Sequence, residues 1–154
     1  ILMLDTGCHW DGYFCDFDRN FGVGDVSLEA IEAHSLLNDS IDSAIQTIRP
    51  GKTKAKDLFE AMDLILRPES VAKSSSSKNV GRYGHGLGMQ LTEPPSHAEW
   101  DTTIIEEGMV LTLEPSITYG EQNFLMVAEE NVLINGEGVQ FLTKRCKNEL
   151  PIIS

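Results

Sequence analysis

The chain has 154 residues, of which 41% are hydrophobic, and its 24 Asp and Glu residues against 12 Lys and Arg residues give a formal net charge of −12. This length and composition are typical of one globular domain with a sizeable core. The acidic balance argues against nucleic acid or an anionic membrane surface as a partner. No apolar run approaches the roughly 18 residues of a membrane span, and no signal peptide is visible.

The three cysteines, Cys8, Cys15 and Cys146, are odd in number and lack a CxxC spacing. Reduced thiols are the simplest interpretation and predict a cytoplasmic protein. The sequence opens on Ile1 inside an apolar run, without a methionine, so we expect it to be the later part of a longer chain.

An Asp-Gly pair at residues 11–12 predicts a β-hairpin over residues 1–21. A two-residue loop pairs positions whose numbers sum to 23, which places Asp5, Asp16 and Asp18 on one face. Three carboxylates on one face repel one another unless a cation lies among them. The hairpin is therefore the first indication of a metal site, with a solvent-facing acidic edge as the alternative.

Two amphipathic helices are predicted next. Ser27 or Asp25 can cap the first, residues 50–51 (Pro-Gly) end it, and Thr53 caps the second. His34 in the first helix is expected to pack or to lie on the surface. The apolar positions at helical spacing are expected to face the core: Leu28, Ile31, Ile41, Ala44, Ile45, Ile48, Ala55, Leu58, Phe59, Met62, Ile65 and Leu66.

The remaining segments predict strands and loops. Residues 1–4 are all apolar, so their strand is expected to be buried on both faces. Residues 67–79 predict a polar loop and residues 92–100 a proline-containing loop. Further strands are predicted at residues 109–113, 124–127 and 131–134.

One histidine lies in a glycine-rich segment, Gly81–Pro95, with the sequence GRYGHGLGMQLTEPP. Glycines let the backbone pass close to a ligand or to another strand. An imidazole at His85 can therefore point into a confined site. Taken alone, the segment is equally consistent with a turn that carries an incidental histidine.

Two glutamates, Glu114 and Glu129, end or interrupt strongly apolar segments, and Asp5 has similar neighbours. An ionised carboxylate in such surroundings is unfavourable unless it is paired or bound to a metal. Together with Asp16 and His85 they form a set of oxygen ligands with one imidazole. This set fits two adjacent divalent ions such as Mn²⁺, Co²⁺, Fe²⁺ or Zn²⁺ better than a thiolate site does.

Four segments of the chain resemble, in order, the metal-binding blocks of the M24 metallopeptidases: LDTGCHWDGYFCDFDRNF, GHGLGMQLTEPP, GMVLTLEPSI and AEENVLI. That family includes methionine aminopeptidase, aminopeptidase P and the Xaa-Pro dipeptidases. The resemblance covers essentially the whole chain, and the ending LTKRCKNELPII resembles the tail of the Xaa-Pro group.

The resemblance implies an α+β fold of the pita-bread (creatinase/aminopeptidase) type, with a curved antiparallel sheet flanked by helices. The fold is expected to be partial, because the first of its two halves normally precedes the leading aspartate. Residues 1–154 are thus expected to be a single M24-like catalytic domain that lacks its N-terminal portion.

The resemblance also implies a site with two divalent metal ions, Mn²⁺ being favoured over Co²⁺, Zn²⁺ or Fe²⁺. Asp16 and Glu129 would bridge both ions, Asp5 would complete one site, and His85 and Glu114 the other. A water between the ions would become the nucleophile, because two cations depress its pKa towards ~7. Glu114, as the proton carrier, and His85 are the expected catalytic residues.

Four further positions are of interest. Arg19 matches an arginine of the family that orients carboxylates, with a surface salt bridge as the alternative. Thr92 stands where the family has a substrate-contacting histidine, and His97 is expected either to fill that space or to lie in a surface loop. Asp18 replaces a small hydroxyl residue; we expect it to face solvent, with a second base or an altered metal preference as alternatives.

The leading functional hypothesis is a metal-dependent Xaa-Pro aminopeptidase or dipeptidase that acts on short peptides, with a homodimer as a possible assembly. Thr92 favours the alternative of an enzyme on the same scaffold that acts on a small molecule, as creatinase or a dimethylsulfoniopropionate lyase does. A binding module without catalysis is the third hypothesis, and the complete ligand set counts against it.

Overall fold

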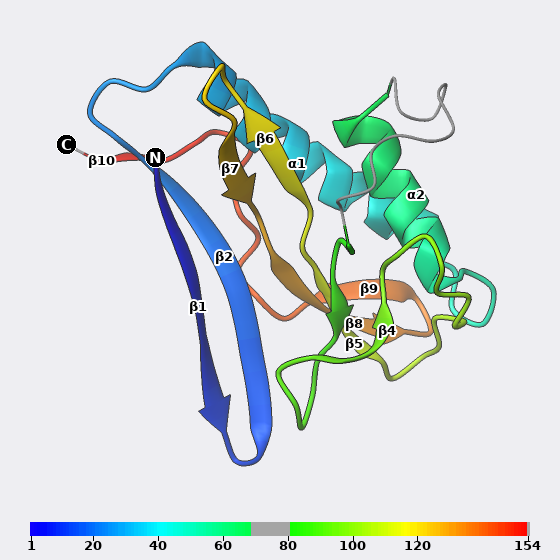
Figure 1. Ribbon diagram of the computed structural model, residues 1–154. Helices are drawn as coiled ribbons and strands as arrows, with labels where there is room; N and C mark the ends of the chain where they lie inside the picture. The colour runs from blue at the N-terminus through cyan, green and yellow to red at the C-terminus, as the bar shows by residue number, and fades with distance from the viewer. Residues whose placement is uncertain (69–80, 154) are drawn as a thin grey trace.

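A computed structural model describes residues 1–68 and 81–153 of the chain (Figure 1). It contains two helices, α1 (Leu28–Thr47) and α2 (Ala55–Leu66), neither of which is long and apolar enough to span a membrane. The strands within the described residues are β1 (Leu2–Trp10), β2 (Tyr13–Val23), β3 (His85–Gly86), β4 (Glu93–Ser96), β5 (Val110–Leu113), β6 (Ser116–Tyr119), β7 (Phe124–Val127), β8 (Glu130–Asn135), β9 (Gly138–Phe141) and β10 (Ile152–Ile153).

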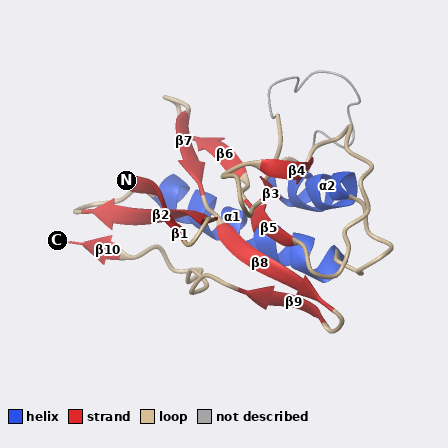
Figure 2. Ribbon diagram, turned by 90° about the horizontal axis from the view of Figure 1, so that it is seen from below, coloured by secondary structure: helices blue, strands red, loops and turns tan. Residues whose placement is uncertain are grey.

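The strands form three small sheets. The largest is antiparallel, in the order β4-β3-β5-β8-β9, and both helices lie along one side of it (Figure 2). β1 and β2 form a long hairpin that extends away from the helices, with β10 parallel to β2, and β6 pairs with β7 (Figure 1). This mixture of helices and antiparallel sheets confirms the predicted α+β class.

The hairpin has the register that its two-residue turn predicts. Asp11 and Gly12 have positive φ angles of 48° and 88°, as this type of tight turn requires. Asp5 consequently lies opposite Asp18, and Gly7 opposite Asp16. The alternation of side chains along both strands then places the three aspartates on one face.

The prediction that residues 1–4 are buried on both faces is wrong. Every residue of β1 is exposed, including Asp5, and Leu4 keeps 44% of its surface accessible. β1 is the edge strand of its sheet and pairs only with β2 among the described residues. An apolar run cannot by itself distinguish a strand covered on both faces from an uncovered edge strand.

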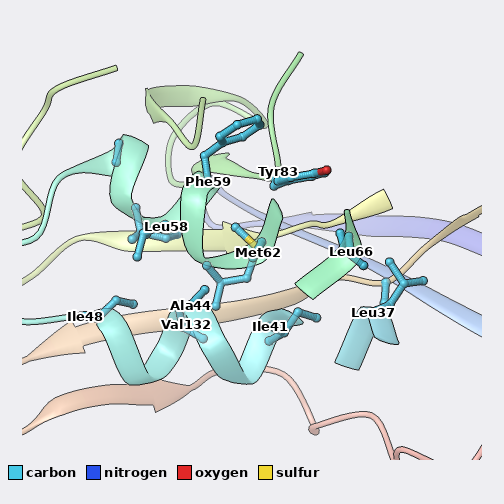
Figure 3. Packing of buried hydrophobic residues seen from close by; sticks show 14 of the residues in the cluster. Leu37, Ile41, Ala44, Ile48, Leu58, Phe59, Met62, Leu66, Tyr83 and Val132 are labelled. Atoms are coloured by element: carbon cyan, nitrogen blue, oxygen red, sulfur yellow. The ribbon is translucent and has the colours of Figure 1, made fainter. Parts of the chain in front are cut away.

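The hydrophobic core lies between the two helices and the strands β5 and β8 (Figure 3). Ile41 of α1 faces Met62 of α2, and Leu37 of α1 lies beside Leu66 of α2. Leu37, Ile41 and Met62 are fully buried. Val132 of β8 closes the cluster from the sheet side. This core fixes the strands whose ends carry the candidate ligands.

The N-terminus of α1 agrees with the sequence, because the Ser27 hydroxyl accepts a hydrogen bond from the Ala30 N–H at 3.3 Å. Two predicted core positions of α1 are wrong, since Leu28 and Ile31 remain 75% and 39% exposed. Ala30, between them in the chain, is buried, so these two side chains lie on the uncovered side of the helix. His34, in contrast, is completely buried.

Thr53 does not cap α2 as predicted. The N-cap residue is Lys54, whose N–H donates to the Asp57 carboxylate at 2.8 Å. The Thr53 hydroxyl instead donates to the Thr47 carbonyl oxygen and accepts from the Arg49 N–H. It therefore closes the C-terminal end of α1 rather than opening α2.

The C-terminal half contains the predicted strands over residues 109–113, 124–127 and 131–134, as β5, β7 and β8. The proline-containing segment 92–100 was not expected to hold a strand, yet β4 lies within it at the edge of the sheet, where missing N–H groups are tolerated. Of the predicted polar loop 67–79, residues 69–79 lie outside the described residues.

Two leucines of α2 provide a test of the core. Leu58→Ala should lower the free energy of unfolding by about 2–5 kcal/mol, because the side chain is fully buried and its removal leaves a cavity. Leu64→Ala, on the same helix but 52% exposed, is the matched control and should cost less than about 1 kcal/mol. Chemical denaturation measures both; equal losses would contradict this description of the core.

Candidate metal centre

Side chains from four parts of the fold converge at one place. Asp16 lies on β2, His85 on β3, Glu114 directly after β5 and Glu129 directly before β8. Ligand atoms of Asp16, His85 and Glu129 lie within 4.8 Å of one another, and so do those of Asp18, Glu114 and Glu129. The Nε2 atom of His85 is 3.9 Å from Oδ2 of Asp16 and 3.7 Å from Oε2 of Glu114.

Asp5 is the one predicted ligand outside both groups. Its position opposite Asp18 places it on the face that carries Asp16, and its charge contributes to raising the pKa of both residues. Its side chain is exposed, unlike those of Asp18 and Glu129. Its assignment as a metal ligand therefore remains a prediction.

The backbone around His85 is packed too tightly for side chains on either neighbour. A Cβ atom on Gly84, whose φ is 129°, would lie 2.2 Å from the Thr112 carbonyl oxygen. A Cβ atom on Gly86 would lie 2.3 Å from the Pro94 carbonyl oxygen. These contacts explain why the histidine is flanked by glycines on both sides.

Hydrogen bonds fix the orientation of the imidazole. The main-chain N–H of His85 donates to the Thr112 hydroxyl at 3.1 Å, and the ring atom Nδ1 lies 2.9 Å from the Gly86 carbonyl oxygen. A proton on Nδ1 donated to that carbonyl leaves the Nε2 lone pair facing the acids. Burial lowers the pKa of His85, which favours this neutral form and suits it to bind a metal.

A buried amide, Asn131, joins the hairpin to the large sheet at Asp16. The Asp16 N–H donates to Oδ1 of Asn131 at 3.2 Å, and Nδ2 of Asn131 donates back to the Asp16 carbonyl oxygen. The side chain thus serves both backbone groups as a neighbouring strand would. Sequence reasoning missed this residue; the available signal was a polar side chain within the apolar strand after Glu129 and Glu130.

Arg19 fixes the main chain next to the acids. Its guanidinium donates to the carbonyl oxygens of Asp18 at 2.7 Å and Glu129 at 2.6 Å. It also pairs with the Glu130 carboxylate at 3.0 Å, and Glu130 is fully buried. This geometry fits the predicted orienting role, through the backbone of β2 and β8, and it differs from an exposed salt bridge.

The expectation that Asp18 faces solvent is wrong. Its exposure is only 3%, that of Glu129 is 1%, and each has a buried carboxylate oxygen without a hydrogen-bond partner in the described part of the chain. Burial, assisted by the charges of neighbouring acids, raises the pKa of Asp18 to about 7 and that of Glu129 to about 9. The hairpin register places Asp18 on the same face as Asp5 and Asp16, but the burial of its side chain follows from tertiary packing.

The other two acids are affected in the same direction. Burial raises the pKa of Asp16 and of Glu114, and the charge of Asp16 raises the pKa of Glu114 further. Without a cation, the site therefore disfavours its own ionised form. Carboxylate oxygens without partners and one oriented imidazole are the donors that suit divalent cations, so the residues fit a metal centre.

Thr92 and His97, the two possible substrate-contacting residues, differ in their burial. Thr92 is exposed. His97 has no exposed surface, and its ring lies so close to Gly84 that a Cβ atom there would approach the ring to 2.7 Å. Burial lowers its pKa to about 4. The alternative that His97 lies in a surface loop is wrong, and whether His97 takes the place of the histidine that the family pattern implies at Thr92 stays a prediction.

Comparison with known proteins identifies the family of the chain. Residues 1–139 match the family model of metallopeptidase family M24, and the chain belongs to that family. The Xaa-Pro dipeptidase of Pyrococcus furiosus is 29% identical over 144 residues, which cover 94% of this chain and 40% of that protein.

Two solved structures show the same fold. The dipeptidase of Pyrococcus horikoshii OT3 superposes with a TM-score of 0.83 at 29% identity, covering 98% of this chain and 40% of that one. The X-Pro aminopeptidase of Thermotoga maritima MSB8 has a TM-score of 0.83 at 24% identity, covering 98% and 41%. The pita-bread prediction is confirmed, and the chain spans about two fifths of the length of these relatives.

The two hydrogen bonds between the Asn131 side chain and the main chain of Asp16 give a prediction. Asn131→Ala should lower the free energy of unfolding by about 1–3 kcal/mol, because it leaves the Asp16 N–H and carbonyl unpaired in a buried place. Asn135→Ala is the matched control, since the Asn135 side chain on the same strand accepts one bond among the described residues, from the exposed Glu137 N–H. Chemical denaturation compares them; a larger loss for the control would contradict the bridging role.

Removing metal should make stability depend on pH. The pKa values of Asp18 and Glu129, about 7 and about 9, exceed the ordinary values of 3.8 and 4.5, so the folded chain binds protons that the unfolded chain has released. The associated stability is present in acid and is lost as pH rises through these folded-state values. The melting temperature of chelator-treated protein should therefore fall between about pH 5 and about pH 9, and added Mn²⁺ should reduce the fall. A melting temperature that rises over this range without metal would contradict the prediction.

Proposed function

We propose that the protein is a metal-dependent hydrolase that cleaves Xaa-Pro peptide bonds near the N-terminus of short peptides. The observation that carries this proposal is the convergence of Asp16, His85, Glu114 and Glu129 from separate parts of the fold. Membership of family M24 and the Xaa-Pro dipeptidase relative support the reaction class.

Asp16, His85, Glu114 and Glu129 would hold the metal, and the resemblance to family M24 adds Asp5 and implies two divalent ions. The predominance of carboxylate oxygens favours Mn²⁺ among the candidate metals. When bound, such ions supply an activated water and polarise the carbonyl of the scissile bond.

Glu114 is the residue best suited to move a proton. Its side chain is 32% exposed, more than those of Asp16 and His85, so a substrate can approach it. Burial raises its pKa, which favours uptake of a proton at Oε2. In the proposed reaction Oε2 accepts a proton from the attacking water and delivers it to the leaving amine nitrogen.

The alternative is an enzyme of the same fold that hydrolyses or cleaves a small molecule, as creatinase does. Thr92 favours it, because a threonine cannot take up charge beside a tetrahedral intermediate as a histidine can. In either case the substrate is a short peptide or a small molecule. We further propose a cytoplasmic enzyme, in keeping with the free thiols of Cys8, Cys15 and Cys146, and a homodimer as its assembly.

Purified full-length protein supplied with Mn²⁺ should hydrolyse Xaa-Pro dipeptides or longer peptides with proline in the second position. Glu114→Gln should lower kcat by about 10²–10⁴-fold, because the amide cannot carry the proton. Glu99→Gln, at an exposed glutamate outside the site, is the control and should leave kcat unchanged. Absence of turnover on both peptide classes, with metal bound, would reject the peptidase proposal and leave the small-molecule alternative.

A further inference from the structure

Asp18 is a fifth acid in the metal centre. It lies on the same face of the hairpin as Asp5 and Asp16, and its carboxylate comes within 4.8 Å of ligand atoms of both Glu114 and Glu129. The resemblance that implied the other ligands implies a small hydroxyl residue at this position. The arrangement therefore differs here from the one that the family pattern implies.

The protein itself provides Asp18 with little compensation. The side chain is 3% exposed, and its Oδ1 atom is buried without a hydrogen-bond partner among the described residues. The nearest cation in the sequence, Arg19, donates to the main-chain oxygen of Asp18 and pairs with the carboxylate of Glu130 instead. An unpaired carboxylate in a buried site is costly unless a ligand from outside the chain binds it.

We propose that Asp18 is a further metal ligand, whose carboxylate binds the cation held between Glu114 and Glu129. The inference rests on the metal centre of the proposed function and specifies its composition. With Asp18 the donors around this cation become richer in carboxylate oxygen, while His85 stays the one imidazole. Hard oxygen donors favour Mn²⁺ relative to the metals that prefer nitrogen, such as Co²⁺ and Zn²⁺.

The competing account keeps Asp18 protonated, as a hydrogen-bond donor to Glu114 or Glu129. Asparagine separates the two roles, because its amide can still donate a hydrogen bond but is a neutral and weaker ligand. Serine provides the small hydroxyl that the family pattern implies at this position. Asp11→Asn is the matched control: it removes one negative charge from the turn of the same hairpin, and asparagine tolerates the positive φ there.

Full-length protein and the variants Asp18→Asn, Asp18→Ser and Asp11→Asn are stripped with chelator and titrated with Mn²⁺, Co²⁺ and Zn²⁺ by calorimetry, with circular dichroism to check the fold. Both Asp18 variants should bind Mn²⁺ at least tenfold more weakly, with smaller losses for Co²⁺ and Zn²⁺. Asp11→Asn should match the wild type. Where a variant does not fold, a crystal structure of the Mn²⁺-loaded wild type gives the answer directly, as an Asp18 oxygen at coordination distance from the metal.

Unchanged Mn²⁺ affinity in Asp18→Asn, or an Asp18 carboxylate away from the metal in the crystal, would overturn the inference and leave the proposed function in place. Equal losses for all three metals would overturn the selectivity while supporting the ligand role. A wild type that binds none of the metals would overturn the metal centre itself, and with it both proposals.

Discussion

The burial of several carboxylates at one place is the constraint on which the structure depends. Asp18 and Glu129 are almost fully buried, and burial raises the pKa of each well above its ordinary value. Adjacent Glu130 is buried equally but is fully compensated: it pairs with Arg19 and accepts hydrogen bonds from the Thr143 hydroxyl and the Cys146 N–H. Of two neighbouring glutamates, one is thus built into the fold and the other is left open to a cation.

The rest of the architecture serves to bring these charges together. The acids come from two different sheets, which share no ladder at the site; the Asn131 amide and the Arg19 guanidinium join them instead. Both connections run through main-chain atoms of Asp16, Asp18 or Glu129. They hold the candidate ligands in position without occupying the carboxylate oxygens that a metal would require.

Local sequence patterns predict much of the fold and of the candidate site. The two-residue turn at Asp11 and Gly12 sets the hairpin register, and apolar periodicity locates the helices. Acids in apolar segments indicate the metal site. The burial of individual side chains could not be predicted, because it depends on what covers each face of the hairpin. The apolar residues of β1 are exposed, while Asp18 on β2 is buried. The contacts of Asn131 and Thr112 join residues far apart in the chain, so a polar residue in an apolar strand marks Asn131 without showing which groups it bonds.

The tight fit around His85 affects how such sequences are interpreted. Gly84 and Gly86 are required by main-chain oxygens of Thr112 and Pro94, which belong to the scaffold and take no part in chemistry. A relative that had lost the acids would still need both glycines to fold. The two glycines around the histidine therefore reflect the architecture, whereas the buried Oε1 of Glu129, which has no partner in the described part of the chain, reflects a place for a cation.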